Sequence, residues 1–454
     1  MSYRIEHDSM GEIQVPETAL WGAQTERSRK NFNIGIEKMP KALIQALALV
    51  KKNAAKANEA TGKLETTTSQ AIQQAADKII KGTVDEHFPL SLWQTGSGTQ
   101  TNMNVNEVIA HLAAQSGVTV HPNDHVNMSQ SSNDVFPTAI HIAGVNLVQQ
   151  QLFPVINQMI QTLKKLEAEN EKIIKIGRTH LQDATPVTFS QEISGWRSGL
   201  EHSYRMLALT LDELKQLAIG GTAVGTGLNA SKEYVALFFK YLNEETNNQF
   251  SEDPNKFHGL ASKDAVVFTS GALKALAANV MKMANDIRWM ASGPRSGLGE
   301  ITIPANEPGS SIMPGKINPT QCEALTMIAI QVMGNDTTIG IGASQGNFEL
   351  NVYMPVMAYN LIQSIELLTD GLRSFDQNCL VGIKADQEKM NQYVEQSLML
   401  ITALNGHIGY DNGAKIAKKA FEENITLKQA ALTLGLVTEE EYDSWVKPEQ
   451  MLGK

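Results

Sequence analysis

The sequence predicts a mainly α-helical protein, and three observations support this fold class. Aromatic residues make up only 6% of the 454 residues, whereas methionine is frequent, with 18 copies. Apolar residues after position 138 recur at helical spacing and do not alternate as they would in strands. Long segments such as 265–290 are apolar around much of their circumference, which predicts burial on several sides, in a bundle shared between subunits.

The predicted elements fall into three regions. Residues 1–130 are expected to form an N-terminal, mostly helical domain with a short strand or turn at GEIQVP. Residues 131–384 are expected to form a central domain of long helices, and residues 385–454 a small C-terminal helical domain of shorter, more charged helices. Pro154 is expected to bend or interrupt the first long helix. The helices predicted in the central domain are 138–168, 187–217, 263–291, 319–333 and 352–374.

Composition excludes several classes of function. The formal net charge is −10 and no run of basic residues occurs, which argues against nucleic acid or an anionic membrane as the main partner. The two cysteines, Cys322 and Cys379, have no CxxC spacing, so neither a disulfide framework nor a thiolate metal site is expected. No uninterrupted run of 18 apolar residues occurs, and the N-terminus is polar. We therefore expect a cytoplasmic protein without a membrane segment.

The densest polar cluster lies in the segment GSSIMPGKINPTQCEALTM, residues 309–327. Glycine and proline on both sides of Ser310, Ser311 and Lys316 allow a fixed loop whose backbone N–H groups approach a ligand closely. This loop is predicted to hold an anion. It is not a phosphate-binding P-loop, because five residues separate its glycines where that motif has four.

A helix is predicted directly after this loop. Asn318 is expected to be its N-cap, Pro319 its first residue and Gln321 the capping-box partner of Asn318. The positive end of the helix dipole would then face the loop.

Four polar turns, at 96–101, 130–134, 179–186 and 309–318, are each expected to lead directly into a helix. Helix N-termini flanked by Ser, Thr or Asn side chains can bind carboxylates even in an acidic protein. Taken singly, each turn is more simply an ordinary N-cap, and the sequence alone does not show that the turns converge.

Two other motifs match a known binding pattern but lack the secondary structure that the pattern requires. Gly225, Gly227 and Ala230 match a dinucleotide-binding fingerprint, but a predicted helix precedes them where a strand is required. His121 and His125 have the spacing of a metal-binding pair on a helix, but Pro122 makes a continuous helix across both improbable. No metal site is predicted.

The sequence resembles the class II fumarases of the fumarase/aspartase superfamily along essentially the whole chain. Besides the loop at 309–327, five further blocks carry the resemblance: WGAQTERS at Trp21, QTGSGTQTNMNVNEV at Gln94, HPNDHVNMSQSSND at His121, GRTHLQDATPV at Gly177 and GGTAVGTGLNA at Gly220. The resemblance implies a three-domain fold whose long central helices form a bundle in a homotetramer. It also implies active sites drawn from three subunits, and catalysis without a metal or an organic cofactor.

The resemblance also implies residue roles. Ser310 would be the base that removes a proton from carbon, His180 and Glu323 would act together on the catalytic water, and Lys316 would stabilise the negative charge that develops. Without the resemblance, His180 would be an ordinary surface or core histidine and Glu323 an acid favoured by the helix dipole. The expected substrate-binding residues are Ser97, Thr99, Ser131, Ser132, Asn133, Thr179 and Asn318.

A secondary anion site is implied at the HPND turn, with His121, Asn123 and Asp124. Fumarases usually carry a basic residue just upstream, where this chain has Val118 and Thr119. The strength of this second site is therefore in question.

The activity implied is the reversible hydration of fumarate to (S)-malate in the tricarboxylic acid cycle. The TQCEALTM stretch after Pro319 resembles fumarases and differs from aspartases. An aspartate ammonia-lyase, a catalytically silent structural member of the superfamily and a dicarboxylate-binding or sensor protein are the alternatives.

Overall fold

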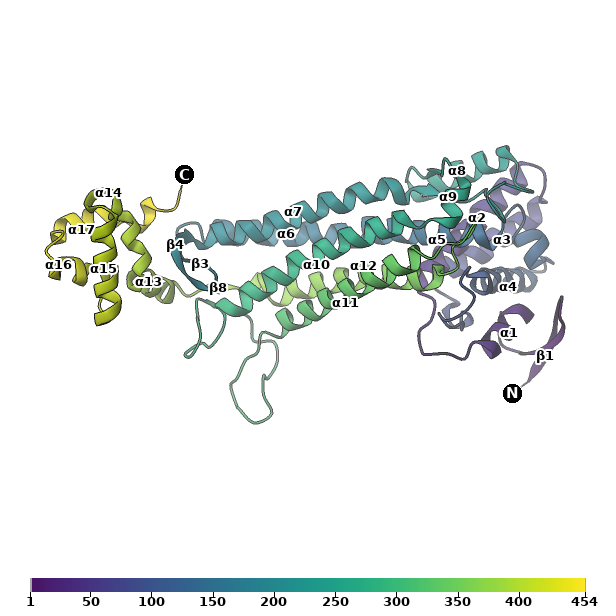
Figure 1. Cartoon of the computed structure of the whole chain (residues 1–454). Coiled ribbons are helices and arrows are strands. Elements are labelled where there is room, and N and C mark those ends of the chain that lie inside the picture. The colour runs from purple at the N-terminus through teal and green to yellow at the C-terminus, as the bar shows by residue number, and fades with distance from the viewer. Residues whose placement is uncertain (1, 454) are drawn as a thin grey trace. The chain divides into compact units, whose positions relative to one another are not determined.

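A computed structural model describes residues 2–453, and its regular structure is mostly helical (Figure 1). The helices are α1 (Ala23–Asn31), α2 (Lys41–Ala60), α3 (Thr66–Ile80), α4 (Thr99–Gln115), α5 (Ser132–Leu147), α6 (Phe153–Glu169), α7 (Phe189–Leu214), α8 (Lys232–Thr246), α9 (Lys256–Ala261), α10 (Asp264–Met290), α11 (Thr320–Ala343), α12 (Met354–Asn378), α13 (Gln387–Gln396), α14 (Asn405–Ile408), α15 (Tyr410–Glu423), α16 (Leu427–Thr433) and α17 (Glu439–Trp445). The mainly helical fold class is confirmed.

The strands are short and occur in pairs. Three pairs are antiparallel and one, β5 with β6, is parallel. The pairs are β1 (Tyr3–Asp8) with β2 (Gly11–Pro16), β3 (Ile174–Thr179) with β4 (Gln182–Thr188), β5 (Gln216–Leu217) with β6 (Ser251–Glu252), and β7 (Ile301–Thr302) with β8 (Lys384–Ala385). The strand predicted at GEIQVP is β2.

The long helices agree with the predicted ranges, with two instructive details. A π-helical turn, Val148–Leu152, separates α5 from α6, and Pro154 is the second residue of α6, so the predicted interruption is confirmed. Helix α11 continues well beyond the predicted end at residue 333. Buried apolar residues on either side of Gly334, such as Val332 and Ile339, keep this part of the helix packed.

The chain forms two compact units. Unit 1 comprises residues 2–154, 203–277 and 329–369, and unit 2 comprises residues 155–202, 278–328 and 370–453. Helices α7, α10, α11 and α12 contribute residues to both units. The division into domains at residues 130 and 385 stays a prediction.

The core of unit 1 is built around α2, which packs against α3, α4, α5 and α8. Five of its buried apolar residues follow one another at spacings of four and three, as expected for one face of a helix. They are Leu43, Leu47, Val50, Ala54 and Ala57, and Ala48 is fully buried as well, because neighbouring helices cover α2 on more than one side. One charged residue of α2, Lys51, is buried among them.

Unit 2 has a separate hydrophobic cluster formed by its C-terminal helices. Leu404, Ile416 and Ala430 lie at its centre, and Ile176 of β3 packs into the same cluster. The β3–β4 hairpin is thus attached to the C-terminal helices through a buried side chain. Among residues 2–453, no helix is long and apolar enough to cross a membrane.

Candidate active site

The glycine-rich loop of unit 2 is closed at its base by two hydrogen bonds. The backbone N–H of Gly309 donates to the carbonyl of Lys316 at 2.9 Å, and Asn318 Nδ2 donates to the carbonyl of Gly309 at 2.6 Å. A Cβ atom at position 309 would lie 2.4 Å from the Lys316 carbonyl oxygen, so only glycine permits this approach. The loop therefore has a defined shape and presents residues 310–316 at its tip.

The half-buried Ser310 accepts hydrogen bonds from two backbone N–H groups of the same loop. Its Oγ accepts N–H groups from Ile312 at 3.3 Å and Met313 at 3.1 Å. Such donors stabilise negative charge on a serine oxygen. The neighbouring Ser311 is exposed, and its side chain makes no hydrogen bond within residues 2–453.

The start of α11 differs from the prediction. The Pro319 carbonyl accepts the N–H of Glu323 at 3.0 Å, and the helix begins at Thr320. Asn318 is not the N-cap, because the helix begins two positions later and no backbone N–H of the described residues donates to its side-chain oxygen; its side-chain nitrogen donates to the Gly309 carbonyl. Gln321 is not a capping-box partner either, since its Oε1 accepts the hydroxyl of Ser374. The predicted capping box is therefore wrong, although the helix N-terminus still follows the loop directly.

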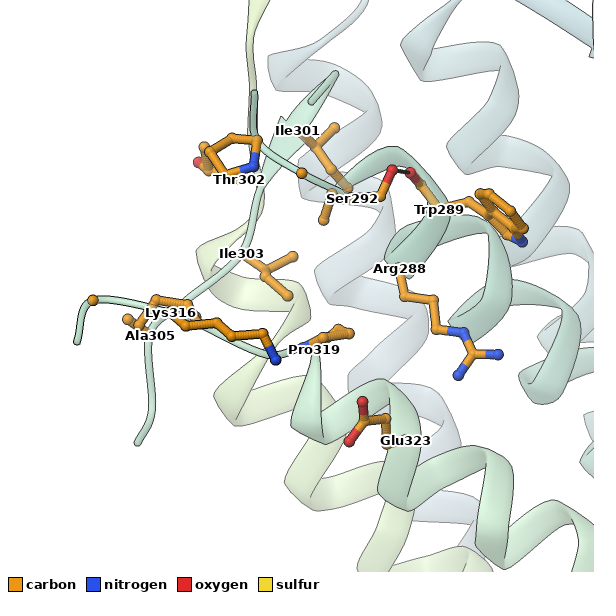
Figure 2. Close-up of a pocket in the computed structure, with 15 residues that line it drawn as sticks. Arg288, Trp289, Ser292, Ile301, Thr302, Ile303, Ala305, Lys316, Pro319 and Glu323 are labelled. Carbon is orange, nitrogen blue, oxygen red and sulfur yellow. Dashed lines mark hydrogen bonds between the residues drawn. The ribbon is translucent and has the colours of Figure 1, made fainter. Parts of the chain in front are cut away.

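A cavity of about 660 Å³ in unit 2 lies beside this loop (Figure 2). Lys316 from the loop, Glu323 from α11 and Arg288 from α10 line it together with Trp289. Arg288 is exposed and forms no ion pair among the described residues. Arg288 was not predicted from the sequence. Its only signal was a cation at the end of a long apolar helix, a pattern that is common at helix C-termini.

His180 lies at the tip of the β3–β4 hairpin. His180 and Leu181 form its two-residue turn with φ angles of 58° and 59°, as type I′ turns require. Glycine and asparagine are the residues that favour these angles, so His180 and Leu181 are held there at a conformational cost typical of functional sites. The expectation that residues 179–186 lead directly into a helix is wrong, because β4 intervenes and α7 begins only at Phe189.

Thr179 and His180 are both exposed, and His180 makes no hydrogen bond or ion pair with Glu323 within the described residues. The predicted pair is thus not formed inside one chain. It stays a prediction that involves more than one copy.

An ion-pair network anchors this hairpin. Arg178 Nη1 lies 2.9 Å from Oε2 of Glu300, which is completely buried, and Lys175 Nζ lies 3.5 Å from the same oxygen. Glu300 directly precedes β7, which leads into the glycine-rich loop. The hairpin with His180 and the start of the loop segment are therefore attached to one buried carboxylate.

The two polar turns of unit 1 lead into helices as predicted. Gly98, with a φ of 73°, precedes the first residue of α4, Thr99, whose Oγ1 lies 2.8 Å from Ser97 Oγ. Ser131 caps α5 and forms a capping box with Asp134. These two turns are brought together, because a Cβ atom at Gly98 would lie 2.2 Å from the ring of Phe136 on α5.

Hydrogen bonds hold the second of these turns in place. Asn102 Nδ2 of α4 donates to Ser132 Oγ at 3.0 Å, and Asn133 Nδ2 donates to the carbonyl of Ala223 at 2.8 Å. Of the residues predicted to bind carboxylates, those of the two turns thus occupy one region of unit 1, whereas Thr179 and Asn318 belong to unit 2.

The HPND turn forms a π-helical turn, Pro122–Val126. His121 Nδ1 accepts the N–H of Asp124 at 3.0 Å and lies 3.2 Å from its carboxylate, which is exposed. Asn123 Nδ2 contacts the sulfur of Met103 at 3.7 Å. A carboxylate beside the histidine opposes anion binding, so the turn itself does not replace the basic residue missing upstream.

Comparisons with known proteins agree over the whole chain. Residues 11–334 match the family described as Lyase, and residues 400–453 match the family described as Fumarase C C-terminus. A fumarate hydratase class II of Bacillus cereus is 59% identical over 100% of this chain and 99% of the relative. A crystal structure of the class II fumarase of Schistosoma mansoni is similar, with a TM-score of 0.97, 43% identity and 99% of both chains covered.

Fold, loop and matched family together define the class of this protein, which is a lyase. The family can be stated more narrowly than this class, because relatives from several bacteria are 56 to 59% identical over the full chain. The chain belongs to the class II fumarate hydratase family.

Proposed function

We propose that this chain catalyses the reversible hydration of fumarate to (S)-malate, with Ser310 as the base. The observation that carries the proposal is the position of Ser310 Oγ, which accepts two backbone N–H groups at the tip of a closed loop. A serine hydroxyl is a weak base unless its alkoxide is stabilised, and these donors supply that stabilisation.

In the dehydration direction, Ser310 removes the C3 proton of malate. The resulting carbanion is delocalised into the neighbouring carboxylate as an aci-form, which carries additional negative charge. Lys316 and the N-terminus of α11 stabilise this charge because both are in place before it develops. Asn318 contributes by closing the loop through Gly309.

His180 and Glu323 act on the hydroxyl group that leaves. His180 donates a proton so that the hydroxyl departs as water, and the carboxylate of Glu323 holds the imidazole in the required tautomer. Because the two residues are not joined within one chain, we place them in the same site on different subunits of a homotetramer.

The carboxylates of the substrate are held by the polar turns. Ser132 is positioned by the side chain of Asn102, and Asn133 by the backbone carbonyl of Ala223. The full set proposed is Ser97, Thr99, Ser131, Ser132, Asn133 and Thr179.

The proposed homotetramer is supported by exposed apolar side chains on α11. Met327, Ile330 and Ile341 are more than half exposed in the single chain. Large exposed apolar residues on a long helix are typical of a face that another subunit covers. A cytoplasmic role in the tricarboxylic acid cycle fits the two free, buried cysteines, Cys322 and Cys379.

We propose the secondary anion site at His121, Asn123 and Asp124 only as a weak one, because its single basic group already faces a carboxylate.

Three assays on the purified protein test the proposal. Ultraviolet absorbance should show fumarate forming from (S)-malate, and a coupled assay should show no ammonia released from aspartate. Ammonia release would instead identify an aspartate ammonia-lyase. Tight malate binding without turnover would indicate a binding protein, and neither binding nor turnover a silent structural member.

A further inference from the structure

Lys51 of α2 is a fully buried cation without a carboxylate partner. Its exposed fraction is 0%, and Nζ donates to Asn127 Oδ1 and Gln130 Oε1, both at 2.9 Å. No carboxylate of residues 2–453 forms an ion pair with it. A buried ammonium group is unfavourable unless a carboxylate pairs with it, so a buried lysine that binds only two neutral amide side chains is unusual. Burial lowers the pKa of Lys51 to about 7, and only Asp134 opposes this shift through its charge.

The partners of Lys51 belong to the segment that leads into the Ser131 turn. An ammonium group can only donate hydrogen bonds, so Asn127 must turn its side-chain oxygen toward Lys51. The same oxygen accepts Asn102 Nδ2 at 3.1 Å and Asn106 Nδ2 at 3.2 Å. Lys51 therefore determines which way the amide of Asn127 faces, and Asn127 in turn requires Asn102 to present its nitrogen.

This chain of hydrogen bonds extends to the hydroxyl of Ser132, which is one of the proposed substrate-binding groups. The nitrogen of Asn102 also donates to Ser132 Oγ at 3.0 Å. Since Ser132 Oγ accepts this bond, its own proton remains available as a donor. No acceptor for that proton is found among residues 2–453, and a substrate carboxylate at the turn would be one.

The charge of Lys51 is also not neutralised by its nearest acid. The Asp134 carboxylate accepts backbone N–H groups from Ser131 at 2.9 Å, Gly220 at 3.0 Å and Thr222 at 2.9 Å. These contacts direct the carboxylate at the backbone and away from hydrogen-bond distance of Lys51. In a chain of net charge −10, a dianionic ligand needs a local source of positive charge, and a buried one is weakly screened.

We propose that Lys51 is a positioning residue for the substrate carboxylate: it orients the Ser132 hydroxyl through Asn127 and Asn102 and, in its protonated form, supplies buried positive charge next to the turn. The proposal rests on the proposed function in so far as a dicarboxylate binds at this turn. It extends that function to a residue outside the polar turns themselves.

Two variants test it by different routes. Lys51→Met removes both the charge and the donor at similar volume. Asn127→Asp is isosteric and neutralises Lys51 while it keeps an oxygen for Asn102, and it sacrifices only a long 3.3 Å bond from Nδ2 to the Gln130 carbonyl. Lys263→Met is the matched control. Lys263 is also buried, but it donates only to backbone carbonyls, those of Gly259 and Leu260 in α9 and that of Ser262 directly after α9.

The measurement is kcat and KM for (S)-malate, with circular dichroism and oligomeric state checked for each variant. We expect KM to rise roughly tenfold in Lys51→Met and Asn127→Asp, which corresponds to about 1.4 kcal/mol, while kcat changes less than about threefold. Lys263→Met should leave KM unchanged even if it lowers the unfolding temperature. A merely structural role for Lys51 would lower stability in both lysine variants and leave KM alone.

A KM within about twofold of the wild-type value in both Lys51→Met and Asn127→Asp would overturn the proposal. Should Lys51→Met fail to fold, Asn127→Asp decides. If the wild-type protein does not turn over malate, the proposed function fails separately, and the dissociation constants of fumarate and succinate, measured by calorimetry, replace KM. A roughly tenfold weaker binding in the variants then supports the role of Lys51, and equal binding overturns it.

Discussion

Arg178 Nη1 and Glu300 Oε2 form a 2.9 Å ion pair that attaches the β3–β4 hairpin to the strand before the glycine-rich loop. Glu300 is completely buried, and Lys175 approaches the same oxygen. The guanidinium also lies over the ring of Tyr393, 5.8 Å from its centroid. Two segments with proposed catalytic residues, His180 and Ser310, thus depend on one buried carboxylate for their attachment.

Replacing Arg178 by methionine should therefore destabilise the protein and lower turnover together. Removal of Arg178 leaves the buried Glu300 carboxylate with Lys175 alone, 3.5 Å away, and we expect the free energy of unfolding to fall by about 2 kcal/mol. Arg373→Met is the control, because its ion pair with Asp370 is solvent-exposed and should contribute less than about 1 kcal/mol. Chemical denaturation monitored by circular dichroism measures both. Equal losses in the two variants would contradict the anchoring role.

Ser310→Ala should abolish most of the activity without unfolding the protein. The loop is closed by Gly309, Lys316 and Asn318 and does not need the Ser310 side chain for that closure. We expect kcat to fall at least about 100-fold, since the proton-abstracting group is lost. Ser311→Ala, which alters an exposed neighbour, should retain nearly wild-type kcat. If Ser311→Ala is the inactive variant, the base has been assigned to the wrong serine.

His180→Asn and Glu323→Gln should each lose most turnover, yet a mixture of the two should regain part of it. Neither residue contacts the other within one chain, so a shared site needs one subunit with an intact histidine and another with an intact glutamate. When the two variants are refolded together, their subunits assemble at random, so each requirement is met with a probability of one half. About a quarter of the sites of a symmetric oligomer should then meet both requirements. Turnover of the co-refolded mixture, compared with each variant refolded alone, gives the answer. No recovery would indicate that both residues act from the same chain.

Lys51 should make the stability depend on pH above neutrality. Its pKa is lowered from 10.5 to about 7 by burial, so between these values the unfolded chain binds more protons than the folded one. The free energy of unfolding therefore rises with pH across this window, by up to about 1.4 kcal/mol per pH unit, and below the window the contribution of Lys51 no longer changes with pH. Lys51→Met should lack this rise.

The comparison needs unfolding midpoints of wild type and Lys51→Met at several pH values across that window. The exposed Lys164→Met serves as a control that should run parallel to wild type. A constant difference between wild type and Lys51→Met at every pH would show that burial does not lower the pKa of Lys51 in the folded state.

Features that depend on neighbouring residues could be predicted from the sequence. The long helices and the interruption near Pro154 follow from apolar spacing and proline geometry, although the first long helix begins at Ser132 and not at the predicted residue 138. The family and its activity were also within reach, because polar blocks spread along the chain carry the resemblance. The β3–β4 hairpin was missed because its strands are short and isolated, and their stability comes from Ile176 in the C-terminal cluster and from Glu300.

Contacts between residues far apart in the sequence decided the cases in which the local sequence pattern was misleading or silent. Asn318 has the sequence context of an N-cap, but the carbonyl of Gly309, nine positions away, takes its side-chain nitrogen. Lys51 lies beside another lysine on a helix and gives no local sign of burial, because its partners Asn127 and Gln130 are 76 and 79 positions away. Sequence by itself therefore determined the long helices, which depend on residues a few positions apart, and the family, which is recognised from local blocks of sequence. The direction of a side chain's hydrogen bond and the burial of a charge depend on contacts that only the folded chain brings together.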